Sequence, residues 1–280
     1  MPKFKIALQG KIGAYSYLAC QHLYPNLQAL ECHSFRDVMD RVKSGEAKYG
    51  MIPVENSTAG RVADVHNLLR EMDVNIIREY FMPINHCLLA PKGTTLKTIK
   101  TVYSHVQALS QCDLNISKNG FRKQEMADTA GAAKWVSEQA GNECAAISSE
   151  PSAKEYGLEV LVNGYQDTGH NTTRFIVVSQ GALEHSFDQG SYITTIVFKV
   201  KNMPAALYKV LGGFATNKVN VLKIESYFVD GGFKSTQFCM DIEAHIDEKR
   251  MKNAMKELGF FANSVKILGC YPAHKFRKQL

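Results

Sequence analysis

The pattern of apolar and polar positions over the first 180 residues alternates between short apolar runs and stretches with helical spacing. The short apolar runs predict strands at 5–10, 27–33, 49–54, 101–105, 143–149 and 158–163. Apolar residues three and four apart predict helices at 14–23, 35–44, 61–72, 106–116, 129–140 and 150–157. Strands that alternate with helices indicate an α/β domain with largely parallel sheets.

The stretch 74–90, VNIIREYFMPINHCLLA, is too long for one typical strand and contains Pro83. We interpret it as a crossing between two lobes, with the chain returning within 158–180. Because ligands of open α/β sheets bind beyond the carboxyl ends of strands, a cleft is the expected site. The predicted domain spans 1–180, with lobe 1 at about 1–78 plus 160–180 and lobe 2 at about 79–159.

The pattern changes after Ser179. Residues 180–191, QGALEHSFDQGS, are polar and lack periodicity, which is typical of a linker. Residues 191–275 then follow the order strand, helix, strand, strand, helix, strand, with a GG turn at 231–232 between the middle strands. This order predicts a second domain of the ferredoxin-like βαββαβ type.

Composition narrows the class of protein. Hydrophobic residues at 45% and charged residues at 21% are ordinary for a soluble globular chain, so no membrane segment is expected. The N-terminus lacks the pattern of an export signal, and seven scattered cysteines without a CxxC pair favour reduced thiols, so a cytoplasmic location is predicted. Basic residues exceed acidic ones by only 33 to 27, without a basic stripe, and we interpret the tail 274–280 as solvated; no nucleic-acid partner is expected.

The segment GHNTTRF places Asn171, two threonines and Arg174 directly before the apolar run 175–178. An unpaired buried donor costs about 1–3 kcal/mol, so these groups need partners. Either local hydrogen bonds hold a strand entrance, or Arg174 clamps a carboxylate through two N–H donors. In an extended chain Thr173 and Phe175 face one side, and Thr172 and Arg174 face the other.

Other polar motifs lie at the ends of predicted strands. Ser104 and Gln107 match a helix capping box, which leaves His105 and Gln111 unassigned. Asp128 or Thr129 is expected to cap a helix whose first turn is small. The loop 9–16, QGKIGAYS, is either a tight turn or a set of backbone N–H groups aimed at an anion.

Taken together, these segments resemble the prephenate dehydratase family with a C-terminal ACT regulatory domain. The motifs occur in family order across nearly the whole chain: IPVENSTAG (52–60), YSHVQALSQC (103–112), DTAGAA (128–133), CAAISSEPSAKEYGLEVL (144–161) and NTTRF (171–175). The resemblance implies a two-lobed, periplasmic-binding-protein-like catalytic domain at 1–180, an ACT domain at 191–275, and no cofactor or metal. It also implies a carbon–oxygen lyase that converts prephenate to phenylpyruvate in L-phenylalanine biosynthesis.

Site residues follow from the same resemblance, position by position. Thr173 is the expected catalytic residue, with His105 as a backup acid. The expected substrate-binding residues are Arg174, Asn171, Ser104, Gln107, Glu55, Asn56, Ser57 and Thr129.

The regulatory motifs depart from the family pattern. The family signatures are Pro-Gly-Ala-Leu and Glu-Ser-Arg-Pro, and the corresponding residues here are Pro204, Ala205, Ala206, Leu207 and Glu225, Ser226, Tyr227, Phe228. Ala205 adds a methyl where glycine would let an effector approach the backbone, so feedback by L-phenylalanine is expected to be weakened. The resemblance also implies a homodimer or homotetramer.

Two alternatives stay open at this point. Arogenate, which has an ammonium where prephenate has a keto group, would suit the same fold. A non-catalytic cytosolic amino-acid sensor would combine a two-lobed binding domain with an ACT domain.

Overall fold

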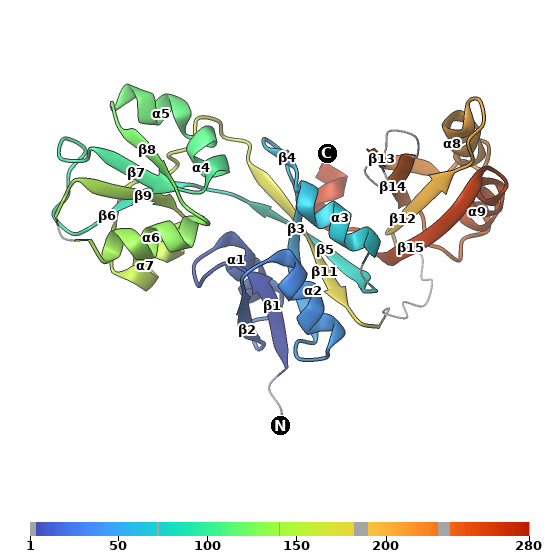
Figure 1. Cartoon of the computed structure of the whole chain (residues 1–280), viewed down its shortest axis with the longest axis horizontal. Coiled ribbons are helices and arrows are strands. Elements are labelled where there is room, and N and C mark those ends of the chain that lie inside the picture. Colours follow the sequence, from blue (N-terminus) through green and yellow to red (C-terminus); the bar gives the residue numbers. More distant parts are fainter. Residues whose placement is uncertain (1–3, 72, 140, 182–189, 229–235, 280) are drawn as a thin grey trace. The chain divides into compact units, whose positions relative to one another are not determined.

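A computed structural model describes residues 4–71, 73–139, 141–181, 190–228 and 236–279. The chain forms two compact units, shown with their elements in Figure 1. The first unit consists of Met1–His66 and Tyr80–Phe175, and the second of Asn67–Glu79 and Ile176–Leu280. None of the described helices is long and apolar enough to cross a membrane.

A six-stranded sheet with the order β2-β1-β3-β11-β5 carries the N-terminal part of the chain, and β4 pairs with β3. β1 is parallel to both of its neighbours, as the alternating pattern predicts. The strands are β1 (Lys5–Gln9), β2 (Gln28–Cys32), β3 (Tyr49–Asn56), β4 (Gly60–Arg61), β5 (Asn75–Pro83) and β11 (Thr172–Ser179). The helices between them are α1 (Tyr15–Leu23), α2 (Phe35–Lys43) and α3 (Ala63–Glu71).

A five-stranded sheet with the order β10-β6-β9-β7-β8 forms the second lobe of the first unit. β7 is parallel to β8 and β9, whereas β6 is antiparallel to β9 and β10, so the sheet is mixed. Its strands are β6 (Cys87–Ala90), β7 (Thr101–Ser104), β8 (Arg122–Glu125), β9 (Cys144–Ser148) and β10 (Glu159–Val162). Helices α6 (Thr129–Ser137) and α7 (Glu150–Tyr156) follow β8 and β9.

The chain changes sheets at 84–86, and again at 163–171. The predicted crossing within 74–90 is therefore confirmed: Pro83 ends β5, and β6 begins in the other sheet at Cys87. Along β6 the side chains alternate between two cores, with Cys87 and Leu89 in one and Leu88 and Ala90 in the other.

The predicted single helix at 106–116 is wrong. Two short helices, α4 (Val106–Gln111) and α5 (Asp113–Lys118), meet at Cys112, where φ is −116° and ψ is 15°. The carboxylate of Asp167 accepts from Leu114 N at 2.9 Å and from Asn115 N at 3.1 Å. These N–H groups at the start of α5 therefore have a side-chain partner, which stabilises a new helix start.

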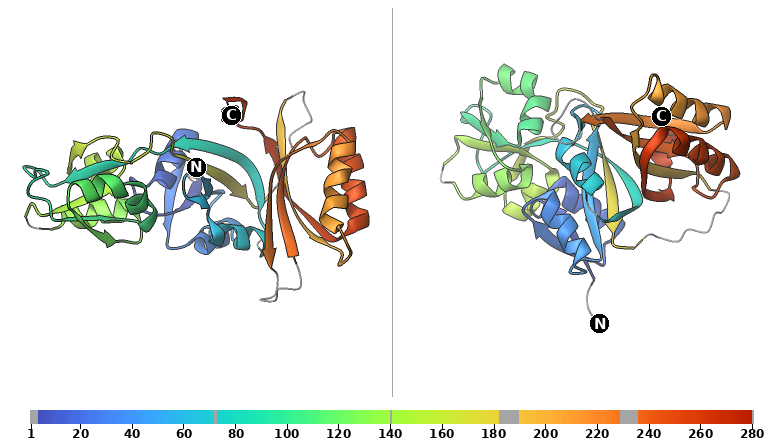
Figure 2. Two further views of the ribbon diagram at one scale, coloured as in Figure 1. Left: turned by 90° about the horizontal axis from the view of Figure 1, so that it is seen from above. Right: turned by 45° about the vertical axis from the view of Figure 1, so that its right-hand side comes forward.

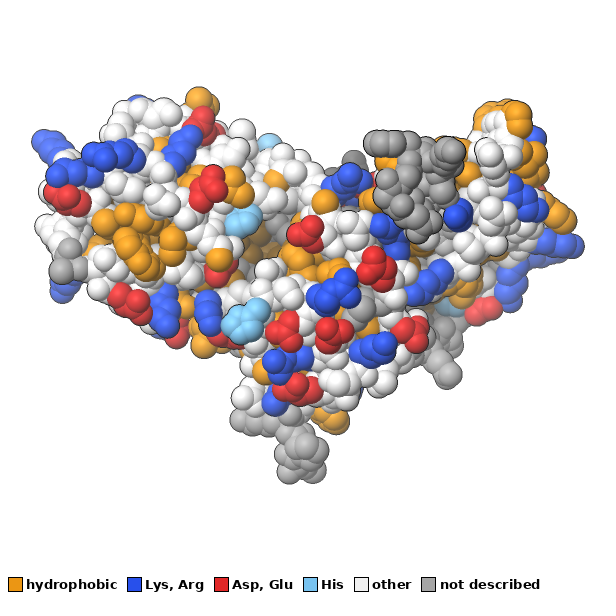
Figure 3. Space-filling view, in the orientation of Figure 1, with side chains coloured by type: hydrophobic (Ala, Val, Ile, Leu, Met, Phe, Trp, Pro, Cys, Tyr) orange, Lys and Arg blue, Asp and Glu red, His pale blue; other side chains and the backbone are white. Residues whose placement is uncertain are grey.

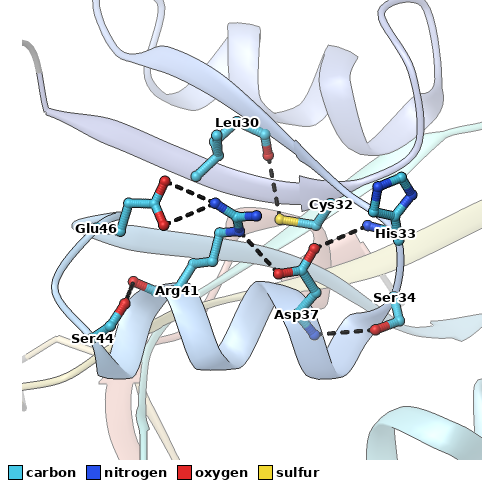
Figure 4. A network of polar contacts seen from close by, with 8 residues as sticks. All are labelled: Leu30, Cys32, His33, Ser34, Asp37, Arg41, Ser44 and Glu46. Atoms are coloured by element: carbon cyan, nitrogen blue, oxygen red, sulfur yellow. Dashed lines mark hydrogen bonds and ion pairs between the residues drawn. The ribbon is translucent and has the colours of Figure 1, made fainter.

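The start of α2 is held by a polar network (Figure 4). Ser34 Oγ accepts from Asp37 N at 3.1 Å, and the Asp37 carboxylate accepts from His33 N at 3.2 Å. Arg41 Nε donates to Asp37 at 2.9 Å, and its Nη1 lies 2.8 Å from both carboxylate oxygens of Glu46. The hydrogen bond from Arg41 lowers the pKa of Asp37 below its usual range.

Replacing Asp37 by Asn is expected to lower the free energy of unfolding at neutral pH by up to about 1 kcal/mol. A carboxyl whose pKa is depressed in the folded state stabilises above its unfolded pKa, and this contribution is lost as pH falls through the folded value. The difference from the wild type should therefore shrink below about pH 4. Urea unfolding at pH 7 and at pH 3 measures this difference in the free energy of unfolding. Asp40→Asn, at an exposed position of the same helix, is the control. An equal loss at both pH values would show that the charge of Asp37 does not cause the stabilisation.

The C-terminal unit contains a four-stranded antiparallel sheet with the order β13-β14-β12-β15. Helices α8 and α9 lie side by side on one face of it (Figure 2). The elements are β12 (Tyr192–Val200), α8 (Ala206–Thr216), β13 (Asn220–Phe228), β14 (Thr236–Glu243), α9 (Lys249–Phe261), β15 (Ala262–Pro272) and the 3₁₀ helix η1 (Lys275–Gln279). The predicted ferredoxin-like βαββαβ order is confirmed. Most of the predicted linker 180–191 and the turn at 231–232 lie outside the described residues.

The C-terminal tail is not simply solvated, contrary to the prediction. Arg277 donates from Nε and Nη2 to the two carboxylate oxygens of Glu79, at 2.6 and 2.8 Å. His274 N donates to the same carboxylate at 3.0 Å. Glu79, on β5, is 1% exposed, and a buried carboxylate requires a paired charge and hydrogen-bond donors.

Acidic and basic side chains are interspersed over the elements of the first unit on the face drawn in Figure 3. The formal net charge of +6 is therefore not concentrated in one basic region there. This distribution is typical of a solvated surface.

Candidate active site

The turn that follows β3 fixes the direction of one amide side chain. Ser57 N donates to Thr172 O at 2.9 Å, and Thr172 N donates to Ser57 Oγ at 2.9 Å, so this turn is joined to the start of β11. Asn56 Oδ1 accepts from the backbone N–H groups of Thr58 at 3.0 Å and Ala59 at 2.9 Å. A backbone N–H can only donate, so the Asn56 oxygen faces the turn and its NH₂ group faces outward.

The outward NH₂ group of Asn56 contacts Thr173. Asn56 Nδ2 donates to Thr173 Oγ1 at 3.0 Å. Thr173 is half-buried, and its hydroxyl oxygen is the acceptor in this contact, so its own hydrogen can be donated to another molecule. An amide donor on the oxygen also polarises the O–H bond.

Two further amides complete a polar cluster with Asn56 and Thr173. Asn56 Nδ2 donates to Asn171 Oδ1 at 2.7 Å, and Asn171 Nδ2 donates to Gln111 Oε1 at 2.8 Å. Gln111 Nε2 donates to Thr58 Oγ1 at 2.7 Å and to Asn56 Oδ1 at 3.2 Å. Gln111 ends α4, so this cluster, which we call the amide cluster, joins the second lobe to β3 and β11.

His86 lies next to the amide cluster. Its Nε2 is 2.8 Å from Gln111 Oε1, and its Nδ1 is 3.1 Å from the hydroxyl of Tyr15, which donates to Asn85 O at 2.7 Å. Burial lowers the pKa of His86 and raises that of Tyr15. Neither residue was predicted, although a histidine between two apolar strands was a detectable signal.

Arg174 faces away from Thr173, as strand alternation predicts. Its Nη1 lies 3.6 Å from Glu55 Oε2, its guanidinium carbon is 6.0 Å from the Phe81 ring centroid, and the residue is 6% exposed. Glu55 and Asn56 are consecutive on β3, and each faces one of these two β11 residues. The guanidinium therefore has the Glu55 carboxylate beside it, whereas Thr173 contacts Asn56.

The predicted capping box at Ser104 and Gln107 is wrong. Ser104 is fully buried, and its Oγ donates to Ile147 O at 2.5 Å. The N-cap of α4 is His105, whose Nδ1 accepts from Gln107 N at 3.3 Å. Burial lowers the pKa of His105, opposed by the negative charges of Asp128 and, more weakly, Glu125.

The start of α6 is capped by Asp128. Its Oδ1 accepts from Gly131 N at 2.6 Å, which confirms one of the two predicted caps. Thr129, the first residue of the helix, is half-buried. The starts of α4 and α6 follow the carboxyl ends of parallel strands β7 and β8, where ligands of α/β sheets bind.

The loop before α1 uses its polar groups within the protein. Ile12 N donates to Glu31 Oε1 at 3.0 Å, and Gly13 O accepts from Ser149 Oγ at 2.7 Å and from Ser152 Oγ at 3.1 Å. A Cβ at Gly13 would lie 2.6 Å from the Ser152 hydroxyl. The loop is therefore a close-packed contact between the two lobes, and a bound anion does not explain its glycines.

The predicted effector residues lie on two elements of the C-terminal unit. Ala205 precedes Ala206 and Leu207 at the start of α8, with φ 56° and ψ 30°, in the left-handed region. Glu225, next to Ser226 on β13, pairs with Lys223 at 3.0 Å. Its neighbour Ile224 is opposite Met240, which packs against the helices, so Glu225 faces the other side of the sheet.

The predicted site residues thus fall into two groups. Asn56, Asn171 and Thr173 lie together, with Ser57 in the adjoining turn and Gln111 added by the structure. Outside the amide cluster lie Ser104 (buried in the second sheet), Gln107 (exposed on α4), Arg174 and Glu55 (across β11), His105 (the cap of α4) and Thr129 (the start of α6).

Fold and site together define a two-lobed α/β protein with a polar cluster of amides and a hydroxyl at neighbouring ends of β3 and β11. The family described as prephenate dehydratase matches residues 6–182. A bifunctional N-acyl-homoserine lactone acylase/prephenate dehydratase of Komagataeibacter europaeus is 41% identical over 98% of both chains. The chain belongs to the prephenate dehydratase family.

Two further relatives agree with this assignment. An arogenate dehydratase/prephenate dehydratase of Arabidopsis thaliana is 34% identical over 96% of this chain and 73% of its own. The crystal structure of prephenate dehydratase from Arthrobacter aurescens in complex with L-Phe has a TM-score of 0.88 at 29% identity, covering 96% of this chain and 90% of that one. The last match extends over most of the residues after 182, which the family match does not reach.

Proposed function

We propose that this chain converts prephenate to phenylpyruvate, with Thr173 donating a hydrogen bond to the departing ring hydroxyl. The observation that carries the proposal is the contact between Asn56 Nδ2 and Thr173 Oγ1 at 3.0 Å. Because the threonine oxygen accepts in this contact, its hydrogen is left for a substrate oxygen. Membership of the prephenate dehydratase family supports the reaction. The contact between Asn56 and Thr173 supports the choice of Thr173 as the donor.

The reaction breaks two bonds between the cyclohexadiene ring and its substituents. The bond to the ring carboxylate breaks, its electron pair enters the ring, and carbon dioxide leaves. The carbon–oxygen bond breaks with its electron pair on oxygen, and the departing hydroxide takes a proton from solvent to become water. Aromatisation supplies the driving force, and assistance is needed at the poor leaving group. Threonine is a very weak acid, so we assign it a hydrogen bond that strengthens as the bond to oxygen stretches.

The neutral character of the amide cluster supports this mechanism. The hydrogen-bond donors around Thr173 come from Asn56, Asn171 and Gln111, none of which is charged. A cation against the ring carboxylate would stabilise the charged ground state that has to lose carbon dioxide. Neutral amides orient the substrate without that penalty.

The direct test is incubation of the purified chain with prephenate, followed by ultraviolet detection of phenylpyruvate. Arogenate is assayed in parallel, and isothermal titration with both acids measures binding. Turnover of prephenate is the expected result. Turnover of arogenate alone would show that arogenate, and not prephenate, is the substrate. Binding without turnover would favour a non-catalytic amino-acid sensor.

The pH profile separates Thr173 from His105 as the donor. A general acid has to carry its proton, and burial lowers the pKa of His105, so its ring is mostly neutral at pH 7. We expect kcat not to increase as pH falls from about 8 to about 6, and His105→Ala to retain kcat within about threefold. Steady-state assays over this pH range measure kcat of the wild type and of His105→Ala. A kcat that rises toward acidic pH in the wild type but not in His105→Ala would show that His105 donates the proton.

We also propose that residues 1–180 and 191–275 are the catalytic and ACT domains of a cytoplasmic homodimer or homotetramer, with L-phenylalanine as effector. The ferredoxin-like order of the C-terminal unit and the match to the L-Phe complex of the Arthrobacter aurescens protein support this assignment. Sedimentation with and without L-phenylalanine tests it. A monomer under both conditions would contradict it.

Ala205→Gly is expected to raise the free energy of unfolding by up to about 1 kcal/mol and to strengthen inhibition by L-phenylalanine. The left-handed backbone at φ 56° strains alanine but not glycine, and removal of the methyl opens the backbone to an effector. Thermal unfolding and inhibition curves measure the two effects. Lys218→Gly is a matched control, because Lys218 has the same φ of 56° outside the effector motifs; it should change stability alone.

A further inference from the structure

His86 is a buried titratable residue next to the site, and the proposed chemistry leaves it unused. It lies between β5 and β6, and it is 3% exposed. Both ring nitrogens have polar neighbours, Gln111 Oε1 at 2.8 Å from Nε2 and the Tyr15 hydroxyl at 3.1 Å from Nδ1. The backbone N of His86 also donates to Gln166 Oε1 at 2.8 Å, and this hydrogen bond fixes the backbone that carries the ring.

The direction of every hydrogen bond in the amide cluster can be worked out from two backbone donors. Thr58 N and Ala59 N donate to Asn56 Oδ1, which leaves Asn56 Nδ2 as the donor toward Thr173 and Asn171. Asn171 therefore accepts at Oδ1 and donates from Nδ2. The atom of Gln111 that receives this second bond is then its oxygen, at 2.8 Å.

The same reasoning assigns the protonation of His86. Gln111 Oε1 faces His86 Nε2, and an amide oxygen cannot donate, so Nε2 carries a hydrogen. Nδ1 then carries no hydrogen and accepts from the Tyr15 hydroxyl, whose single hydrogen is shared between Asn85 O at 2.7 Å and Nδ1 at 3.1 Å. A reversed Gln111 would set its NH₂ group against that of Asn171, and its oxygen against Asn56 Oδ1.

We propose that His86, as the neutral ring protonated on Nε2, is a positioning residue for the dehydration. Its Nε2 hydrogen holds Gln111 Oε1 in place as the acceptor of Asn171 Nδ2, and it thereby supports the position of Asn171 beside Asn56 and Thr173 without touching the substrate. This role rests on the proposed function of Thr173.

Replacement by Leu and by Gln tests the role. His86→Leu removes the donor and leaves Gln111 Oε1 with one partner fewer, and we expect kcat to fall about tenfold or more, with KM for prephenate changed less than about threefold. His86→Gln places an amide NH₂ near the former Nε2 and should restore kcat to within about threefold of the wild type. His33→Leu, which removes an exposed imidazole from the first lobe, is the control.

A double variant separates positioning from general structural support. If His86 acts through Gln111, His86→Leu should have little further effect on kcat in a Gln111→Leu background. Additive losses of kcat, or a loss of melting temperature with kcat unchanged per folded molecule, would overturn the proposal.

A measurement on the unaltered protein covers the case in which the leucine variant does not fold. Nitrogen-15 NMR of histidine-labelled protein, assigned with His86→Gln, reports which ring nitrogen carries the hydrogen. A hydrogen on Nε2 is expected, and a hydrogen on Nδ1 alone would refute the proposal. Failure of the wild type to form phenylpyruvate would instead remove the proposed function, and the NMR result would be unaffected by it.

Discussion

Thr173→Ala is expected to lower kcat by about 10²–10³-fold, with a much smaller change in KM. The hydroxyl acts on the departing oxygen as the bond breaks, so its removal affects the transition state more than substrate binding. Steady-state formation of phenylpyruvate measures both constants.

Two other variants make this result specific. Thr173→Ser retains the hydroxyl and should keep most of kcat. Thr172→Ala removes the same group from the adjacent residue, which faces the other side of β11, and should leave kcat nearly unchanged. A Thr173→Ala enzyme with near-normal turnover would remove the threonine from the mechanism.

Arg277→Met is expected to lower the free energy of unfolding by about 3 kcal/mol or more. The variant leaves the carboxylate of Glu79, whose side chain is 0% exposed, without the two guanidinium bonds at 2.6 and 2.8 Å. Removal of the charged partner of a buried carboxylate is far more destabilising than the loss of a surface ion pair. Urea unfolding at pH 7 gives the difference.

The neighbouring residue provides the control. Lys278→Met removes a positive charge from the exposed next position, and it should change the free energy of unfolding by less than about 0.5 kcal/mol. A second variant, Glu79→Gln with Arg277→Met, removes both charges and should recover part of the loss. Equal effects of Arg277→Met and Lys278→Met would show that the tail is as loosely held as its composition suggests.

The spacing of apolar residues was sufficient to predict most of the strands. The runs 49–54 and 143–149 correspond to the strands β3 and β9. They were predictable because buried strands require apolar residues, and these are visible in the sequence. The strand β8 was missed, since all four residues of Arg122–Glu125 are exposed and give no apolar signal. The break at Cys112 depends on Asp167, more than 50 residues away in the sequence, which local spacing cannot reveal.

The candidate site was predictable in its residue types but not in its geometry. Alternation along β11 correctly separated Thr173 from Arg174, and the partners of each residue came from the neighbouring strand β3. The roles of Gln111 and His86 depend on contacts between segments far apart in the sequence. The same is true of Arg277, which looks like an ordinary charge in a basic tail until Glu79 is seen.

The pairing of Ser57 with Thr172 has a consequence for the chemical ageing of the protein. Spontaneous deamidation of an asparagine begins when the backbone nitrogen of the next residue attacks the side-chain amide, and Asn-Ser is a susceptible pair. Ser57 N is held by Thr172 O at 2.9 Å, and the oxygen of the Asn56 amide is held by the turn. The strand contact that builds the site therefore also slows the conversion of Asn56 to aspartate, which would replace the NH₂ donor beside Thr173 with an oxygen that cannot donate.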